Sequence, residues 1–147
     1  MRKGIRIVLA IIFASIILLL ILCPFINNLS AKHIIAEIKS VPLPQDTQII
    51  ESFSQAGKLV GNGNGMQFFG AVLIESELSL EELDNHYSSY RETPWYCIVK
   101  TQYAQNIDVI EHGTFSLETD VSNGNYYLVY TWGNGISPFQ DLDLRGH

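Results

Sequence analysis

Residues 7–26 form one uninterrupted apolar run, IVLAIIFASIILLLILCPFI, without a charged side chain. The hydrocarbon core of a bilayer is about 30 Å thick, and a helix needs roughly twenty apolar residues to cross it. The run therefore predicts a transmembrane helix. Arg2, Lys3 and Arg6 precede it, and Lys and Arg beside a span stay on the cytoplasmic side. We expect a cytoplasmic N-terminus and an extracytoplasmic C-terminal domain at the cell membrane.

Two other interpretations of this run fit less well. A secretory signal peptide also joins basic and apolar residues, but its apolar part is usually about 7–15 residues long and ends at a small-residue cleavage site, which is not clear here. Lipidation at Cys23 requires a small residue before it, and Leu22 is large. Free Cys behaves as a small apolar residue, so we expect Cys23 to belong to a retained anchor.

Beyond the span, apolar residues first recur with helical spacing over residues 31–41. Ile34, Ile38 and Val41 share one helical face there. This spacing predicts a helix that continues from the span or follows a short break at Pro24. The prolines at positions 42 and 44 end the helix and form a stiff connector.

The following segments have strand patterns. Residues 66–74 carry almost no polar side chain, which predicts a central strand covered on both faces. The other strand candidates are residues 47–60, 95–103, 107–112, 114–119 and 126–132. The sequence Ser-Asn-Gly-Asn at residues 122–125 is typical of a hairpin turn.

Residues 79–93 carry the strongest helix signal of the chain. Ser79 and Glu82 fit a capping box, and Leu78 and Leu83 fit the hydrophobic staple that often accompanies it. We expect this helix to pack on the sheet.

The order of elements predicts an α+β fold, with an N-terminal transmembrane helix followed by a small domain that has an antiparallel sheet and one main packing helix. A short final helix is expected over residues 137–144. The predicted parts are residues 1–30, the cytoplasmic tip and anchor; residues 31–46, the juxtamembrane helix and Pro-rich connector; and residues 47–147, the extracytoplasmic α+β domain.

Charge and cysteine content narrow the functional classes. All fifteen Asp and Glu residues follow the span, and the formal net charge of the chain is −6. Nucleic acids and anionic lipids select basic surfaces, so we expect no nucleic-acid partner. Cys97 is the only cysteine beyond the span, which excludes a disulfide within the domain.

The sequence GNGNG at residues 61–65, here called the Gly/Asn loop, allows two interpretations. Backbone N–H groups of such a loop, with Asn62 and Asn64, form a candidate site for an anionic ligand. Phosphate-binding loops, however, are followed by a helix, and a strand is predicted here. A hairpin turn, for which Asn-Gly is the leading signal, is therefore favoured.

The C-terminal tail, residues 141–147, concentrates polar groups in the sequence DLDLRGH. Asp141, Asp143, Arg145 and His147 are candidate ligand-binding residues, since Arg grips anions bidentately and carboxylates bind cations. Two carboxylates are too few for a calcium site, and a capped terminal helix with solvated charges is the favoured interpretation. We expect no metal site and no cofactor.

Catalysis is not expected. A Cys97 nucleophile would need a histidine and an orienting group beside it, and His86 and His112 are the candidates. The chain contains neither G-x-S-x-G nor H-E-x-x-H. We expect Cys97 to fill the core from a strand, and we assign no catalytic residue.

Aromatic residues offer a further candidate surface. On the predicted strand 126–132, Tyr126, Tyr130 and Trp132 share one face and Tyr127 lies on the other. Tyr and Trp are common interface anchors, but aromatic residues on a strand also pair across a sheet. We favour a role in the core.

Four segments carry a resemblance to a known group of proteins: PLPQDT at residues 42–47, GKLVGNGNGMQFFGAVLI at 57–74, SLEEL at 79–83 and DLDLRGH at 141–147. They resemble a family of small, uncharacterised, membrane-anchored proteins of Gram-positive bacteria. The resemblance implies a cell-envelope location and assigns no role to any residue. Type IV pilins also join an apolar helix to an α+β head, but this chain lacks the acidic residue that pilins carry early in that helix.

The leading hypothesis is a non-enzymatic, single-pass envelope protein, anchored in the lipid bilayer through residues 7–26, whose head binds another protein or a small ligand. The alternative is an extracytoplasmic ligand sensor or hydrolase-like enzyme that uses the Gly/Asn loop and the C-terminal tail. A third hypothesis makes the anchor helix itself the contact within a membrane complex, with Ala14 and Ser15 as its small residues.

Overall fold

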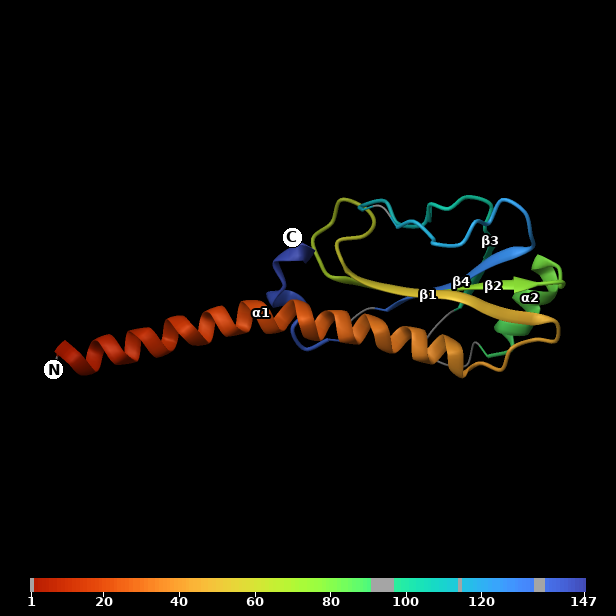
Figure 1. Ribbon diagram of the computed structural model, residues 1–147. Coiled ribbons are helices and arrows are strands. Elements are labelled where there is room, and N and C mark those ends of the chain that lie inside the picture. The colour runs from red at the N-terminus through yellow and green to blue at the C-terminus, as the bar shows by residue number, and fades with distance from the viewer. Residues whose placement is uncertain (1, 91–96, 114, 134–136) are drawn as a thin grey trace.

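The computed structural model describes residues 2–90, 97–113, 115–133 and 137–147 (Figure 1). Its elements are α1 (Arg2–Ser40), β1 (Thr47–Gly57), β2 (Gln67–Ser76), α2 (Leu80–Ser88), β3 (Ile98–Thr101), β4 (Tyr126–Gly133) and the short 3-10 turns η1 (Gln140–Leu142) and η2 (Leu144–Gly146). The strands form one antiparallel sheet in the order β1-β2-β4-β3. The predicted α+β class is confirmed.

Helix α1 is continuous through Pro24, so the expected helix at 31–41 continues from the apolar run without a break. At 1.5 Å per residue its 39 residues extend about 58 Å. The described residues up to Leu22 expose their apolar side chains, and from Cys23 onwards one stripe of the helix is buried. The apolar half is long and apolar enough to cross a membrane, and the second half belongs to the head (Figure 1).

The sheet separates two layers of apolar side chains. On one face, α1 and α2 pack against Phe68, Val72 and Val129. On the other face, the irregular segments 102–113 and 115–125 pack against Phe69, Leu73 and Leu128, and Figure 1 shows them opposite α1. Strand β2 lies between β1 and β4 and is buried on both faces. It is therefore the central strand that its apolar run predicts.

Gly70 sets how closely α1 approaches the sheet. A Cβ atom at this position would lie 2.5 Å from Cγ2 of Ile34 and 3.3 Å from the backbone nitrogen of Ile35. Only a glycine lets the helix backbone lie this near to the strand. The stripe of α1 that makes the contact includes Ala31, Ile34 and Ile38, each at most 2% exposed.

Helix α2 begins as predicted. Ser79 accepts a hydrogen bond from the backbone N–H of Glu82, whose carboxylate accepts one from the backbone N–H of Ser79. The helix ends at Ser88, earlier than the predicted residue 93, and residues 91–93 lie outside the described part of the chain. The same holds for residues 95 and 96 of the strand predicted at 95–103, of which Ile98–Thr101 forms β3.

Three local predictions are wrong. Residues 107–112 and the described part of 114–119 form no strand, and an isolated bridge in this region joins Ser116 to Asn106, which precedes the first of them. Their apolar side chains pack onto one face of the sheet. These segments therefore lie over the sheet and not beside one of its strands, where they could pair. The turn at 122–125 consequently has no strand before it in residues 115–121, and it leads into β4 without forming a hairpin.

The third wrong prediction is the final helix at residues 137–144. The chain forms the 3-10 turns η1 and η2 there. Ser137 accepts a weak hydrogen bond of 3.3 Å from Phe139 N–H and caps no α-helix. The side chain of Asp143 instead caps η2 by accepting a hydrogen bond from the backbone N–H of Arg145.

Candidate functional site

The Gly/Asn loop connects β1 to β2, so the hairpin interpretation is confirmed. The loop is held at its start by side chains from elsewhere. Gln67 accepts hydrogen bonds from the backbone N–H groups of Leu59 and Val60 (2.7 and 2.8 Å), and Glu111 accepts one from Gly61 N–H (2.7 Å). Gly61 has a φ of 69°, a conformation that favours glycine.

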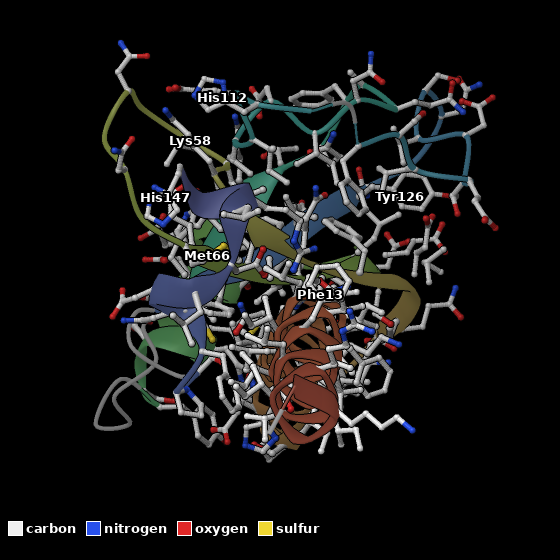
Figure 2. All side chains as sticks on the ribbon, turned by 90° about the vertical axis from the view of Figure 1, so that its left-hand side faces the viewer. Phe13, Lys58, Met66, His112, Tyr126 and His147 are labelled. Carbon is white, nitrogen blue, oxygen red and sulfur yellow. The ribbon has the colours of Figure 1, made fainter. Side chains whose placement is uncertain are left out.

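The C-terminal tail lies against this loop. The backbone N–H of Gly65 donates to the carbonyl of Gly146 at 2.6 Å, and Lys58 N–H donates to the carbonyl of Arg145 at 3.0 Å. Gly146 is packed so closely that a Cβ atom would lie 2.9 Å from the backbone nitrogen of Met66. Figure 2, seen from the N-terminal end of α1, shows the tail beside Met66. The two candidate segments therefore meet, although about eighty residues separate them in the sequence.

The same tail holds α1 where the head begins. The carboxylate of Asp143, on a side chain that is 0% exposed, lies 2.7 Å from Nη2 of Arg145. It also accepts a hydrogen bond of 2.8 Å from Nδ2 of Asn27. Arg145 in turn donates to Oδ1 of Asn28 at 3.0 Å and to the carbonyl of Pro24 at 3.1 Å. These five residues form what we call the junction cluster.

Electrostatics within the junction cluster keep Asp143 ionised. Burial by itself raises the pKa of a carboxyl group. The hydrogen bonds from Arg145 and Asn27, together with the positive charge of Arg145, outweigh that effect and lower the pKa of Asp143 to about 2. The pair thus stays charged at neutral pH, and its main visible role is to join the end of the chain to α1.

The six candidate ligand-binding residues fall into two groups. Asp143 and Arg145 are committed to the junction cluster. Asn62, Asn64, Asp141 and His147 are exposed, with the asparagines in the Gly/Asn loop and the other two in the tail beside it. Their role in binding a ligand stays a prediction. Among the described residues, no group of three His, Cys, Asp or Glu side chains is placed to hold a metal ion.

Cys97 is buried beside β3, and burial raises the pKa of its thiol. Burial and the neighbouring Cys97 also raise the pKa of Tyr87 to about 12. The two candidate partner histidines contact backbone carbonyls elsewhere: His86 lies 2.7 Å from the oxygen of Pro42, and His112 lies 2.7 Å from that of Gly61. The thiol thus has the surroundings of a core residue, as expected.

The aromatic residues of β4 divide between the faces as the strand pattern predicts. Tyr127 packs on the helix side, while Tyr126, Tyr130 and Trp132 pack on the other. The ring of Phe69 lies 4.7 Å from that of Trp132 and 5.6 Å from that of Tyr130, measured between centroids. The favoured interpretation of these residues as core is confirmed.

Sequence reasoning missed a groove beside β3. The groove has a volume of about 490 Å³. Its lining comes from the start of α2, from β3 and from the loop that follows: Leu80, Val99, Lys100, Thr101, Gln102, Tyr103, Ala104, Asn106 and Asp108. Tyr103 is 78% exposed, and Lys100 forms an ion pair with Asp108 at 2.6 Å. The local feature of the sequence that could have indicated this groove is Tyr103, an aromatic residue at the end of the strand predicted at 95–103.

Comparisons with known proteins add no assignment: no family model matches the chain, and neither a curated protein nor a solved structure matches it significantly.

Proposed function

We propose that this protein is a single-pass membrane protein whose head is an extracytoplasmic interaction domain without enzymatic activity. The observation that carries the proposal is the division of α1 into two halves. The first half exposes apolar side chains over the length of a span, and the second half lies in the core of the head. A head joined to its anchor through one continuous helix is held at a fixed height above the membrane.

The groove beside β3 is the surface that we propose for binding. β3 is an edge strand: it pairs with β4 on one side, and no described strand pairs with the other side. Gln102 N–H donates to the carbonyl of Tyr126, so the N–H of Thr101 points away from β4 by the alternation of an antiparallel ladder. Exposed edges of this kind accept extended peptides as an added strand.

The partner that fits this edge is an extended segment of another envelope protein. Leu80 and Val99 offer an apolar wall for a side chain of the partner, and the exposed ring of Tyr103 offers an anchor. The basic residues Arg2, Lys3 and Arg6 before the span and the resemblance to membrane-anchored proteins of Gram-positive bacteria support an envelope location.

Membrane topology is tested by cysteine labelling in intact cells. A cysteine replaces Leu43, which is 43% exposed, or Gly4, where a Cβ meets nothing within 4 Å. A membrane-impermeant maleimide should label Leu43→Cys in intact cells and Gly4→Cys only after lysis. Labelling of Gly4→Cys in intact cells, with Leu43→Cys protected, would reverse the proposed orientation.

The binding surface is tested by photocrosslinking in the native membrane. A benzoylphenylalanine at position 103 should give a discrete adduct, and the same group at position 43 should not. Thr101→Pro removes the outward N–H and should abolish the adduct, because edge strands tolerate proline but lose the donor. Thr101→Ala is the matched control and should retain it. Equal yields from the two variants would argue against strand addition.

The ligand-sensor or enzyme alternative has one observation in its favour, the contact between the Gly/Asn loop and the C-terminal tail. It predicts that phosphate, calcium or zinc raises the melting temperature of the full-length protein in detergent. The double variant Asn62→Ala/Asn64→Ala should lose this rise, because it lacks the two proposed ligand-binding side chains. Both side chains are exposed, so the variant should still fold. An unchanged melting temperature with each ion would count against this alternative.

A further inference from the structure

Two exposed leucines of the C-terminal tail lie next to the end of the apolar run. Leu142 is 49% exposed and Leu144 is 73% exposed. Together with Asp143 and Arg145, the two leucines line one wall of a cleft of about 150 Å³. Leu20 and Pro24 of α1 line the other wall. The tail thus lies beside the last turns of the predicted span, as Figure 1 also shows.

The position of the tail along α1 fixes its height relative to the membrane. Leu20 stands six residues before Ile26, the last residue of the apolar run, which corresponds to about 9 Å along a helix. If the whole run lies in the hydrocarbon core, then a segment packed against Leu20 and Pro24 must lie at the depth of the outer leaflet. Phe25 and Leu29 of α1, 60% and 48% exposed, extend the same apolar region.

Several backbone groups of the tail are hydrogen-bonded within the protein, which lowers the cost of placing it at this depth. A segment that enters a bilayer must satisfy its backbone polar groups internally. Here Leu142 N–H donates to the carbonyl of Phe139 and Gly146 N–H to that of Asp143, while the carbonyls of Arg145 and Gly146 accept from the N–H groups of Lys58 and Gly65. The buried Asp143 carboxylate is neutralised by Arg145. Asp141, Arg145 and His147 are the exposed residues of the tail with charged or polar side chains, and they limit the depth to the headgroup boundary.

We propose that the C-terminal tail is a second membrane contact, with Leu142 and Leu144 inserted at the boundary between headgroups and acyl chains of the outer leaflet. The proposal rests on the proposed membrane anchoring of α1. The partner surface is the lipid bilayer itself, and the inserted leucines add an off-axis contact to the single helix. Two contacts fix the rotation of the head about α1, which a lone span leaves free, and so determine the direction in which the β3 groove faces.

Spin labels on the full-length protein test this contact. In a Cys23→Ala/Cys97→Ala background, single cysteines at positions 142 and 144 carry the label, and the protein is reconstituted into vesicles of phosphatidylcholine and phosphatidylglycerol. Labels at position 12, in the apolar half of α1, and at position 43, in the connector that follows the C-terminal end of α1, are the controls. Collision rates with oxygen and with a water-soluble nickel complex report the depth of each label.

Labels at 142 and 144 should lose accessibility to nickel and gain accessibility to oxygen relative to position 43, at values between those of positions 43 and 12. The tail contact would be overturned if the labels at 142 and 144 were as accessible to nickel as the label at 43 while the label at 12 was immersed in the bilayer. That result would leave the proposed anchor intact. A water-exposed position 12 would overturn both proposals. Because both leucine side chains are exposed, the substitutions should preserve the fold, which circular dichroism checks.

Discussion

At the scale of single residues, Arg145 is the group on which the junction cluster depends. Replacing it by Met keeps much of the aliphatic stem but leaves the buried carboxylate of Asp143 without its cationic partner. Breaking a buried pair costs about 3–5 kcal/mol, and the partial exposure of Arg145 reduces this to about 2–3 kcal/mol. Denaturant unfolding of Arg145→Met in detergent micelles measures the loss.

The surface pair between Lys100 and Asp108 provides the matched control. Its two side chains are 42% and 67% exposed, and exposed pairs contribute less than about 1 kcal/mol. Lys100→Met should therefore lower the free energy of unfolding by less than that amount. If Arg145→Met were no more harmful than Lys100→Met, the junction cluster would not stabilise the head.

Asp143 also predicts a pH dependence with a definite sign. Its pKa is about 2 in the folded protein, below the ordinary value of 3.8, so the folded state binds fewer protons than the unfolded state in this range. Stability from this group is complete above about pH 4 and is lost as the pH falls towards 2. The loss should be about 1–2 kcal/mol. It is measured as the difference between the wild type and Asp143→Asn, which lacks this titration.

Gly70 predicts a steric effect at the contact between α1 and β2. In Gly70→Ala the new methyl group would meet Ile34 at 2.5 Å, and the helix must shift away from the strand. Overpacking of this kind costs about 1–3 kcal/mol. Gly63→Ala, whose Cβ meets nothing within 4 Å, should leave the melting temperature nearly unchanged. Equal melting temperatures for the two variants would contradict the close approach.

At the scale of elements, the capping box of α2 is the best local test. Ser79→Ala removes the acceptor for Glu82 N–H and should cost about 1 kcal/mol. Ser88→Ala is the control, since that hydroxyl donates to the carbonyl of Asn85 and satisfies no free N–H group. Thermal unfolding should separate the two variants by several degrees. A larger loss for Ser88→Ala would show that the cap contributes little.

Elements with a strong local signal could be predicted from the sequence, and elements that depend on distant partners could not. The capping residues Ser79 and Glu82 specify the start of α2, and the apolar run at 66–74 specifies the central strand. The apolar residues of 107–121 suit a strand equally well. Their irregular path is set by packing against a sheet face whose strands come from elsewhere in the chain, and local spacing carries no information on that contact.

The candidate site shows the same division. The tail and the Gly/Asn loop could each be identified by composition, and their contact could not, because it is made by backbone groups of Gly65 and Gly146. The partners of Asp143 and Arg145 on α1 are more than a hundred positions away in the chain. An aspartate and an arginine two residues apart look the same whether they bind a ligand or hold a helix.

At the scale of the whole molecule, α1 makes the proposed membrane anchor and the head one structural unit. Ala31, Ile34 and Ile38 lie in the core that α1 shares with the sheet. Burial of one isoleucine contributes about 1.5–3 kcal/mol, so losing both contacts would cost an amount comparable with the roughly 5–15 kcal/mol net stability of a domain. A fragment that lacks residues 23–40 would also expose the apolar helix-side face of the sheet.

The packing of α1 in the core of the head predicts which fragments of the protein fold. A fragment of residues 22–147 should fold as a monomer with a cooperative thermal transition, because it keeps the docked half of α1 and the junction cluster. A fragment of residues 42–147 keeps α2 and the four strands that the structure describes, yet it should bind a hydrophobic dye and aggregate. Circular dichroism and size-exclusion chromatography compare the two. A stable monomer of 42–147 with the melting temperature of 22–147 would mean that α1 lies on a head that folds without it, and the proposed rigid coupling between the membrane and the β3 groove would then be lost.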